Sequence, residues 1–367
     1  MLLASLILIL VVEPTQITRW DDPTPITAAS VEISEQGVQI RREDNQPPEL
    51  IAWYQIRSIE PSPASRFDNN QVSLDTWRAH ARVRRGDYSG ALPIYERLGE
   101  RFLWKHGPQS ADVSAGLVQC WLDQHQRSKA ITAMFAWYVA TEQRPVAGNE
   151  QTTETQGGQG AIHELAVDPV YRLLLDLPPV YLPDDRLAML ELLPGDIETS
   201  ARTQLLVLYF QIAQSASLDA QMQLRLEQLR REIRGRDQGL ELVADMVMAS
   251  YHPDPSKRQA ARDALQRRAR AEQGGWREVW ARLGLGSAML QDEDPLVNEQ
   301  GAIELMHITV RLGELRPVLT RLAATMLQNY FNKTGRPQWG AKIMNDALRH
   351  RSIGVPERLP EEHSTDG

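Results

Sequence analysis

The side chains that most often bind metals or catalyse reactions are scattered along this 367-residue chain, which has eight histidines and one cysteine. No two histidines form an HExxH pattern or lie four residues apart, the spacing that places two ligands on one helix face. His163, followed by Glu164 in "IHEL", has no second ligand beside it. G-x-S-x-G, Walker-type and G-x-G-x-x-G patterns do not occur. We therefore expect no catalytic residue, no metal ion and no cofactor.

Two acidic clusters are the next candidates for a binding site: Asp184-Asp185 and Asp292-Glu293-Asp294. Neither has the D-x-D-x-D-G spacing of a calcium loop. The second cluster ends just before Pro295, and acidic residues favour the start of a helix because its first N–H groups carry partial positive charge. We expect this cluster to cap a helix, and a cation site is the alternative.

Charge narrows the choice of partner. The formal net charge of −8 argues against a nucleic-acid-binding protein, which would present a basic surface. Basic residues concentrate only in 225–272, where 11 of them stand among 8 acidic residues. This mixture predicts a solvated helix surface with ion pairs. The alternative is contact with an acidic partner or with anionic lipid head groups, which would be a peripheral association with a membrane.

The N-terminus contains an apolar run over residues 2–12. Eleven residues are too few to span a bilayer, which needs about 20, but they suit the core of a signal peptide. A small-residue cleavage site stands further along, at Thr27-Ala28-Ala29. We expect residues 1–29 to be a signal or export segment and the protein to be exported, periplasmic or part of the cell envelope. A misassigned start codon or a short buried strand is the alternative.

Residues 30–60 are expected to form a small β unit. Residues 30–34 and 38–43 alternate apolar and polar side chains around a short loop, and 49–59 come after a Pro-Pro break. About 30 residues cannot bury much surface alone, so this unit should dock on the next part of the chain. Its predicted core is Val31, Ile33, Val38, Ile40, Ile51, Trp53 and Ile56.

From residue 72 the apolar pattern becomes helical. Helix pairs are expected in 72–143, a flexible linker in 144–160, an α-helical repeat domain in 161–352 and a disordered tail in 353–367. Residues 168–185 are apolar but interrupted by prolines, which predicts a packed irregular segment. Cys120 lies in an apolar run and is expected to be buried. Five tryptophans should fill gaps between helices or, alternatively, line a groove as anchors: Trp104, Trp121, Trp137, Trp276 and Trp280.

The stretch "RRGDYSGALPIYERLGERF" (84–102) carries a repeat signal. Gly86 permits a turn, Tyr88 comes just after it, and Ala91 and Tyr95 place a small and an aromatic residue on the next helix. Together with Ala79 on the preceding helix, these positions resemble the tetratricopeptide repeat family, in which 34-residue helix-turn-helix units stack.

The resemblance covers about 150 residues. "WARLGLGS" matches the pattern again through Trp280, Leu283 and Gly284. The first pair departs from it, since Asp75 and Arg78 stand where the family has Trp and Leu. The fold class implied is mainly α, a helix-turn-helix solenoid with a small N-terminal β unit. A non-superhelical α-bundle is the alternative.

The resemblance implies a protein-interaction scaffold without enzymatic activity, whose helical groove binds a partner protein or peptide. Polar residues on the first helix are the candidates for contact: Arg78, Arg82 and Arg85. Two alternatives remain open. One is an enzyme with an unrecognised site in the 160–255 region, and the other is a purely structural envelope component.

Overall fold

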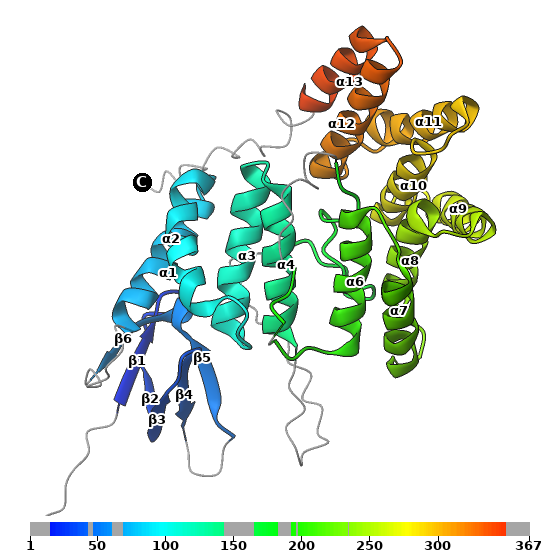
Figure 1. Ribbon diagram of the computed structural model, residues 1–367. Helices are drawn as coiled ribbons and strands as arrows, with labels where there is room; N and C mark the ends of the chain where they lie inside the picture. Colours follow the sequence, from blue (N-terminus) through cyan, green and yellow to red (C-terminus); the bar gives the residue numbers. More distant parts are fainter. Residues whose placement is uncertain are drawn as a thin grey trace, which may run out of the picture. The chain divides into compact units, whose positions relative to one another are not determined.

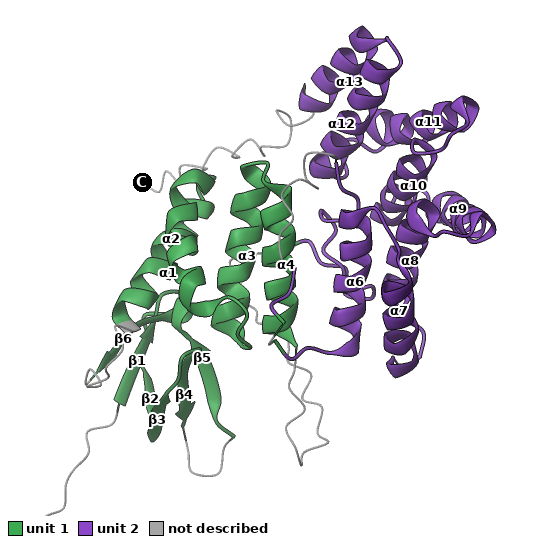
Figure 2. Cartoon of the chain, in the orientation of Figure 1, with its two compact units in different colours: residues 1–165, 195–197 green, residues 166–194, 198–367 purple. Residues whose placement is uncertain are grey.

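A computed structural model describes residues 15–42, 47–60, 69–142, 165–182, 192–195, 197–233 and 235–349. The chain divides into two compact units (Figure 2). Unit 1 comprises Met1–Leu165 and Gly195–Ile197, and unit 2 comprises Ala166–Pro194 and Glu198–Gly367. The described residues form twelve α-helices and a small N-terminal β region, so the expectation of a mainly α chain with a β unit is confirmed.

The β region holds two antiparallel three-stranded sheets, with strand orders β2-β1-β6 and β3-β4-β5 (Figure 1). The expected hairpin is present, with Ile33 opposite Val38. The expected third strand is interrupted by a 3-10 turn, η1 (Trp53–Gln55), so its two halves join different sheets. The strands are β1 (Thr15–Arg19), β2 (Ile26–Ala28), β3 (Ser30–Ile33), β4 (Gly37–Arg41), β5 (Glu49–Ala52) and β6 (Ile56–Glu60).

The β region begins earlier than the sequence suggested. β1 and β2 lie before residue 30, and Ile17 on β1 is fully buried. The proposed cleavage site at Thr27-Ala28-Ala29 falls at the end of β2, whereas the apolar run at 2–12 lies outside the described residues. Val31 and Ile33, predicted to be core residues, are only half-buried, because β3 is at the edge of its sheet.

Unit 1 also contains two antiparallel helix pairs. Gly86, at φ 74°, makes the turn inside the first pair, and the Asp87 carboxylate caps α2 by accepting the Gly90 N–H at 3.0 Å. Gly116 on α3 lies against the ring of Tyr95, where any Cβ would collide with it. The small residue therefore lets α2 and α3 pack closely. The helices are α1 (Asn69–Val83), α2 (Tyr88–Phe102), α3 (Pro108–Asp123) and α4 (Arg127–Thr141).

In unit 2, most consecutive helices pack on one another. Prolines stand at the first position of four of them, where a helix does not need the backbone N–H that proline lacks. The first helices of successive pairs, α6, α8 and α10, also pack against one another. The helices are α6 (Ala201–Ser215), α7 (Ala220–Glu232), α8 (Gln238–Tyr251), α9 (Pro255–Ala271), α10 (Trp276–Met289), α11 (Pro295–Arg311), α12 (Pro317–Lys333) and α13 (Pro337–Arg349).

Several predicted segments lie outside the described residues. They include the linker at 144–160 and the tail at 353–367. Among the described helices, none combines the length and apolarity needed to cross a bilayer.

Candidate interaction surfaces

The three arginines expected to contact a partner divide into two groups. Arg82 on α1 pairs with a residue of the same chain: its Nη1 lies 2.6 Å from Oδ2 of Asp87, the capping residue of α2. Hydrogen bonds from the Gly90 N–H and from Arg82 lower the pKa of Asp87. Arg82 therefore fixes the α1–α2 turn. Arg85 lies in that turn and is exposed.

Arg78 lies near a buried carboxylate. Asp75 on α1 accepts hydrogen bonds from Gln71 Nε2 at 2.8 Å and from Arg97 Nη2 on α2 at 2.9 Å, and Arg78 Nη1 lies 3.8 Å away. The side chains of Arg78 and Arg97 stay 53% and 60% exposed. We call Arg78, Arg85 and Arg97 the arginine surface. Arg97 is not among the arginines predicted from the sequence, because its place beside Asp75 depends on how α2 packs on α1.

The first helices of both pairs in unit 1 carry the β region. η1 packs on α1 and α3. The indoles of Trp20 and Trp77 stack with their centroids 4.8 Å apart, and the Tyr54 N–H donates to Gln109 Oε1 on α3 at 2.9 Å. In unit 1, part of the same chain therefore covers one face of these first helices.

A histidine and a carboxylate meet inside this covered face. His80 Nε2 on α1 lies 3.0 and 2.9 Å from the two carboxylate oxygens of Asp112 on α3, and both side chains are buried. The rings of Tyr54 and Tyr95 lie 5.9 and 6.5 Å from the His80 ring. Burial and the nearby Asp112 charge raise the pKa of Tyr54 to about 12. Because no face of His80 is open to solvent, this pair can tie α1 to α3 but cannot meet a substrate.

In unit 2, residues 166–182 form an extended segment held by the helices. It begins with a tight hairpin in which Val167 bridges to Leu174. Asp168 Oδ1 accepts the N–H groups of Val170 and Tyr171 at 2.9 and 2.7 Å. Asp168 Oδ2 accepts the indole N–H of Trp276 on α10 at 2.9 Å. The hairpin is therefore fixed to α10.

Side chains from three places on the helices hold the rest of this segment. Trp280 on α10 donates its indole N–H to Leu175 O at 2.8 Å. Arg202 on α6 donates to Tyr171 O at 2.8 Å, and Arg316, the residue before α12, lies 3.6 Å from Asp176. Burial raises the pKa of Asp176 despite the Arg316 charge. The buried side chains of the segment are Tyr171, Leu173, Leu174, Leu175, Leu177, Val180 and Tyr181.

The segment at 166–182 thus covers first helices in unit 2 as the β region covers them in unit 1. Residues 166–182 are largely buried, whereas most strand residues of the β region stay partly or fully exposed. Both parts are held by hydrogen bonds that involve backbone groups. In each unit, one face of the first helices is therefore covered by the same chain.

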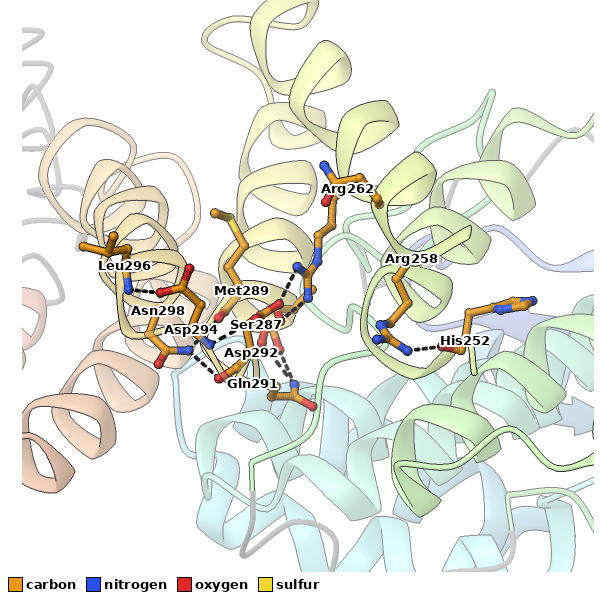
Figure 3. Close-up of polar contacts among 12 residues, drawn as sticks. His252, Arg258, Arg262, Ser287, Met289, Gln291, Asp292, Asp294, Leu296 and Asn298 are labelled. Carbon is orange, nitrogen blue, oxygen red and sulfur yellow. Dashed lines mark hydrogen bonds and ion pairs between the residues drawn. The ribbon is translucent and has the colours of Figure 1, made fainter. Parts of the chain in front are cut away.

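The acidic cluster before α11 caps that helix (Figure 3). Asp294 Oδ1 accepts the Leu296 N–H at 2.8 Å, and Asp292 Oδ2 lies 2.7 Å from Arg262 Nη1 on α9. The hydrogen bond from Arg262 lowers the pKa of Asp292. In the described part of the chain, no three His, Cys, Asp or Glu residues are grouped as a metal site would require. Asp184, Asp185 and His163 lie outside that part.

The basic stretch 225–272 contains the ion pairs expected of a solvated helix surface. Arg236 pairs with Glu241 at 2.8 Å, and Arg268 pairs with Asp245 at 3.2 Å. Cys120 is fully buried, as predicted, and burial raises the pKa of its thiol to about 12.

Comparison of this chain with family models, with curated proteins and with solved structures finds no match. The resemblance to tetratricopeptide repeats therefore stays a prediction, and the geometry of the described residues is the basis for any function.

Proposed function

We propose that this protein is a non-enzymatic interaction scaffold or adaptor of the cell envelope. Its helix pairs would stack as a tetratricopeptide-like solenoid, and the packing of consecutive helices supports this arrangement. A scaffold of this kind binds through surface burial and a few anchoring side chains, with no covalent chemistry.

The arginine surface is the observation that carries the proposal. Arg78 and Arg97 converge on Asp75 from two helices, and each side chain stays more than half exposed. A guanidinium has five N–H donors, so one bond to Asp75 leaves several for another acceptor. Arginine binds carboxylates in a planar, two-bonded geometry, so we infer a partner peptide or protein with acidic residues.

The covering of the first helices is a second observation that bears on the position of the proposed partner. The resemblance placed the ligand in a groove along these helices, but the β region and residues 166–182 already lie there. We therefore assign the partner to the outer side of the α1–α2 pair.

Affinity capture from the envelope fraction tests this proposal. The wild-type chain should retain a partner that the Arg78→Gln/Arg85→Gln double variant loses. These side chains are exposed, so the variant should keep the wild-type circular dichroism spectrum. Arg267→Gln/Arg270→Gln on α9 is the matched control, because both residues are exposed and lie in unit 2. Recovery without any partner, or equal loss in both double variants, would count against the scaffold.

A further inference from the structure

Helix α11 leaves a row of large apolar side chains in solvent. Leu296, Ile303 and Val310 are 68%, 49% and 80% exposed. Residues seven apart lie almost directly above one another on an α-helix, so the three side chains form one stripe about 21 Å long. Figure 3 shows Leu296 pointing away from the hydrogen-bonded turn at the start of the helix. The opposite face of α11 is buried, with Ala302, Leu305 and Ile308 in the core.

We propose that this row is the contact surface between two copies of the chain, packed antiparallel along α11. The spacing is symmetric about Ile303, since Leu296 precedes it and Val310 succeeds it by the same seven residues. A twofold axis beside Ile303 would bring the two Ile303 side chains together. It would also set Leu296 of each copy opposite Val310 of the other. Each copy then contributes the same face to the contact, as closed twofold dimers require.

The charges along α11 favour antiparallel over parallel packing of two copies. Glu293 and Asp294 stand exposed at the start of the helix, and Arg311 is exposed at its end. Antiparallel packing brings the acidic start of one helix beside Arg311 of the other, and it also opposes the two helix dipoles favourably. Parallel packing would place the acidic ends together.

The size of the row sets the strength of the contact. Stable interfaces bury about 1,200–2,000 Å² in total, and three aliphatic side chains from each copy supply only part of that. The dimer should therefore dissociate on dilution. The arginine surface lies in unit 1 and α11 lies in unit 2, so this inference does not depend on the proposed function.

Cysteine cross-linking tests the register. The native Cys120 is buried, so an introduced cysteine is the reactive one. Ile303→Cys should form a disulfide-linked dimer on mild oxidation. Leu296→Cys alone should not, because its two copies would be about 21 Å apart, far beyond the Cα separation that a disulfide allows. A mixture of Leu296→Cys and Val310→Cys chains should give the mixed dimer.

Sedimentation of the otherwise unmodified chain tests the association itself. Wild type should pass from monomer to dimer as its concentration rises, and Ile303→Asp should raise the dissociation constant roughly tenfold or more by burying a charge in the contact. Ile303 is half exposed, so the variant should fold as wild type does. A wild-type chain that stays monomeric at all concentrations would overturn the proposal and leave the row for a different partner. Leu296→Cys cross-linking as efficiently as Ile303→Cys would overturn the antiparallel register.

Discussion

The hydrogen bonds between α10 and the extended segment at 166–182 can be tested by replacing two tryptophans, one at a time, with phenylalanine. Trp280→Phe removes the indole N–H that reaches Leu175 O at 2.8 Å, in a place where the tryptophan is 1% exposed. Trp276→Phe removes the same kind of donor from Asp168 Oδ2, at 2.9 Å. The two changes are chemically identical and lie four residues apart on one helix, so each controls for the other.

Because the two acceptors lie in different surroundings, the two substitutions should lower the free energy of unfolding by different amounts. A buried carbonyl that loses its donor costs about 1–3 kcal/mol. The smaller ring forfeits roughly 40 Å² of buried surface, or about 1 kcal/mol at 25 cal/mol per Å². Trp280→Phe should thus lower the free energy of unfolding of unit 2 by about 2–4 kcal/mol. Trp276 is half-buried, and Asp168 keeps two backbone N–H donors, so Trp276→Phe should cost only about 0.5–1.5 kcal/mol.

Urea unfolding and amide hydrogen exchange measure both effects. Exchange is needed because a chain of two units need not unfold in one transition. In Trp280→Phe the amides of Arg172 and Leu175, which are hydrogen-bonded within the segment, should exchange faster than in Trp276→Phe. If the two variants differ by less than about 0.5 kcal/mol and exchange alike, the Trp280–Leu175 bond is not what holds the segment.

Four further predictions concern other buried or N-terminal groups. His80→Leu should cost about 3–5 kcal/mol in urea unfolding by leaving the Asp112 carboxylate buried without its partner, and adding Asp112→Leu should recover part of that loss; additive losses would contradict this. Burial raises the pKa of Asp176, so its carboxyl group stays protonated in the folded chain at pH values above the ordinary pKa of 3.8. As the pH rises from there, the wild-type chain should lose stability relative to Asp176→Asn. The stability advantage of Asp176→Asn should therefore be larger at pH 7 than at pH 4 in paired denaturation curves, and the opposite trend would refute it. Cys120, with its pKa raised to about 12, should react with a water-soluble thiol reagent only after denaturation; equal rates in the native protein would show that it is accessible. Any cleavage of the N-terminal segment should leave Thr15 in the mature chain, because β1 begins there; an intact mass that starts at residue 30 would show otherwise.

The helices were largely readable from the sequence because their boundaries carry local signals. The region 161–352 was expected to be α-helical, and α8 spans Gln238–Tyr251 within it. Asp237 begins that helix by accepting the Leu240 N–H at 2.9 Å, an interaction that depends only on neighbouring residues. The sequence did not predict β1 and β2, because both lie in the part expected to be an export segment and β2 has too few residues to show an alternating pattern.

Contacts between distant residues were not readable. The packed character of 168–185 was predicted, but its partner Trp280 lies 105 residues after Leu175. His80 and Asp112 are 32 residues apart, and each alone resembles an ordinary polar residue on a helix. The candidate arginines could be placed on the surface, but the internal role of Arg82 depends on where Asp87 caps the next helix.

The segment at 166–182 also determines how this protein can be cut into pieces. A fragment that begins at residue 198 would contain the helices from α6 onward but would lose the buried leucines at 173–177 and the acceptor of Trp280. Such a fragment should aggregate, whereas one that begins at residue 166 keeps these contacts. Conversely, the two fragments of a chain nicked between residues 182 and 198 should remain associated under native conditions, because the segment at the end of the first fragment stays bound to the second. The segment would then hold the two fragments together. A probe can be introduced into the segment by preparing the two fragments separately and reassembling them.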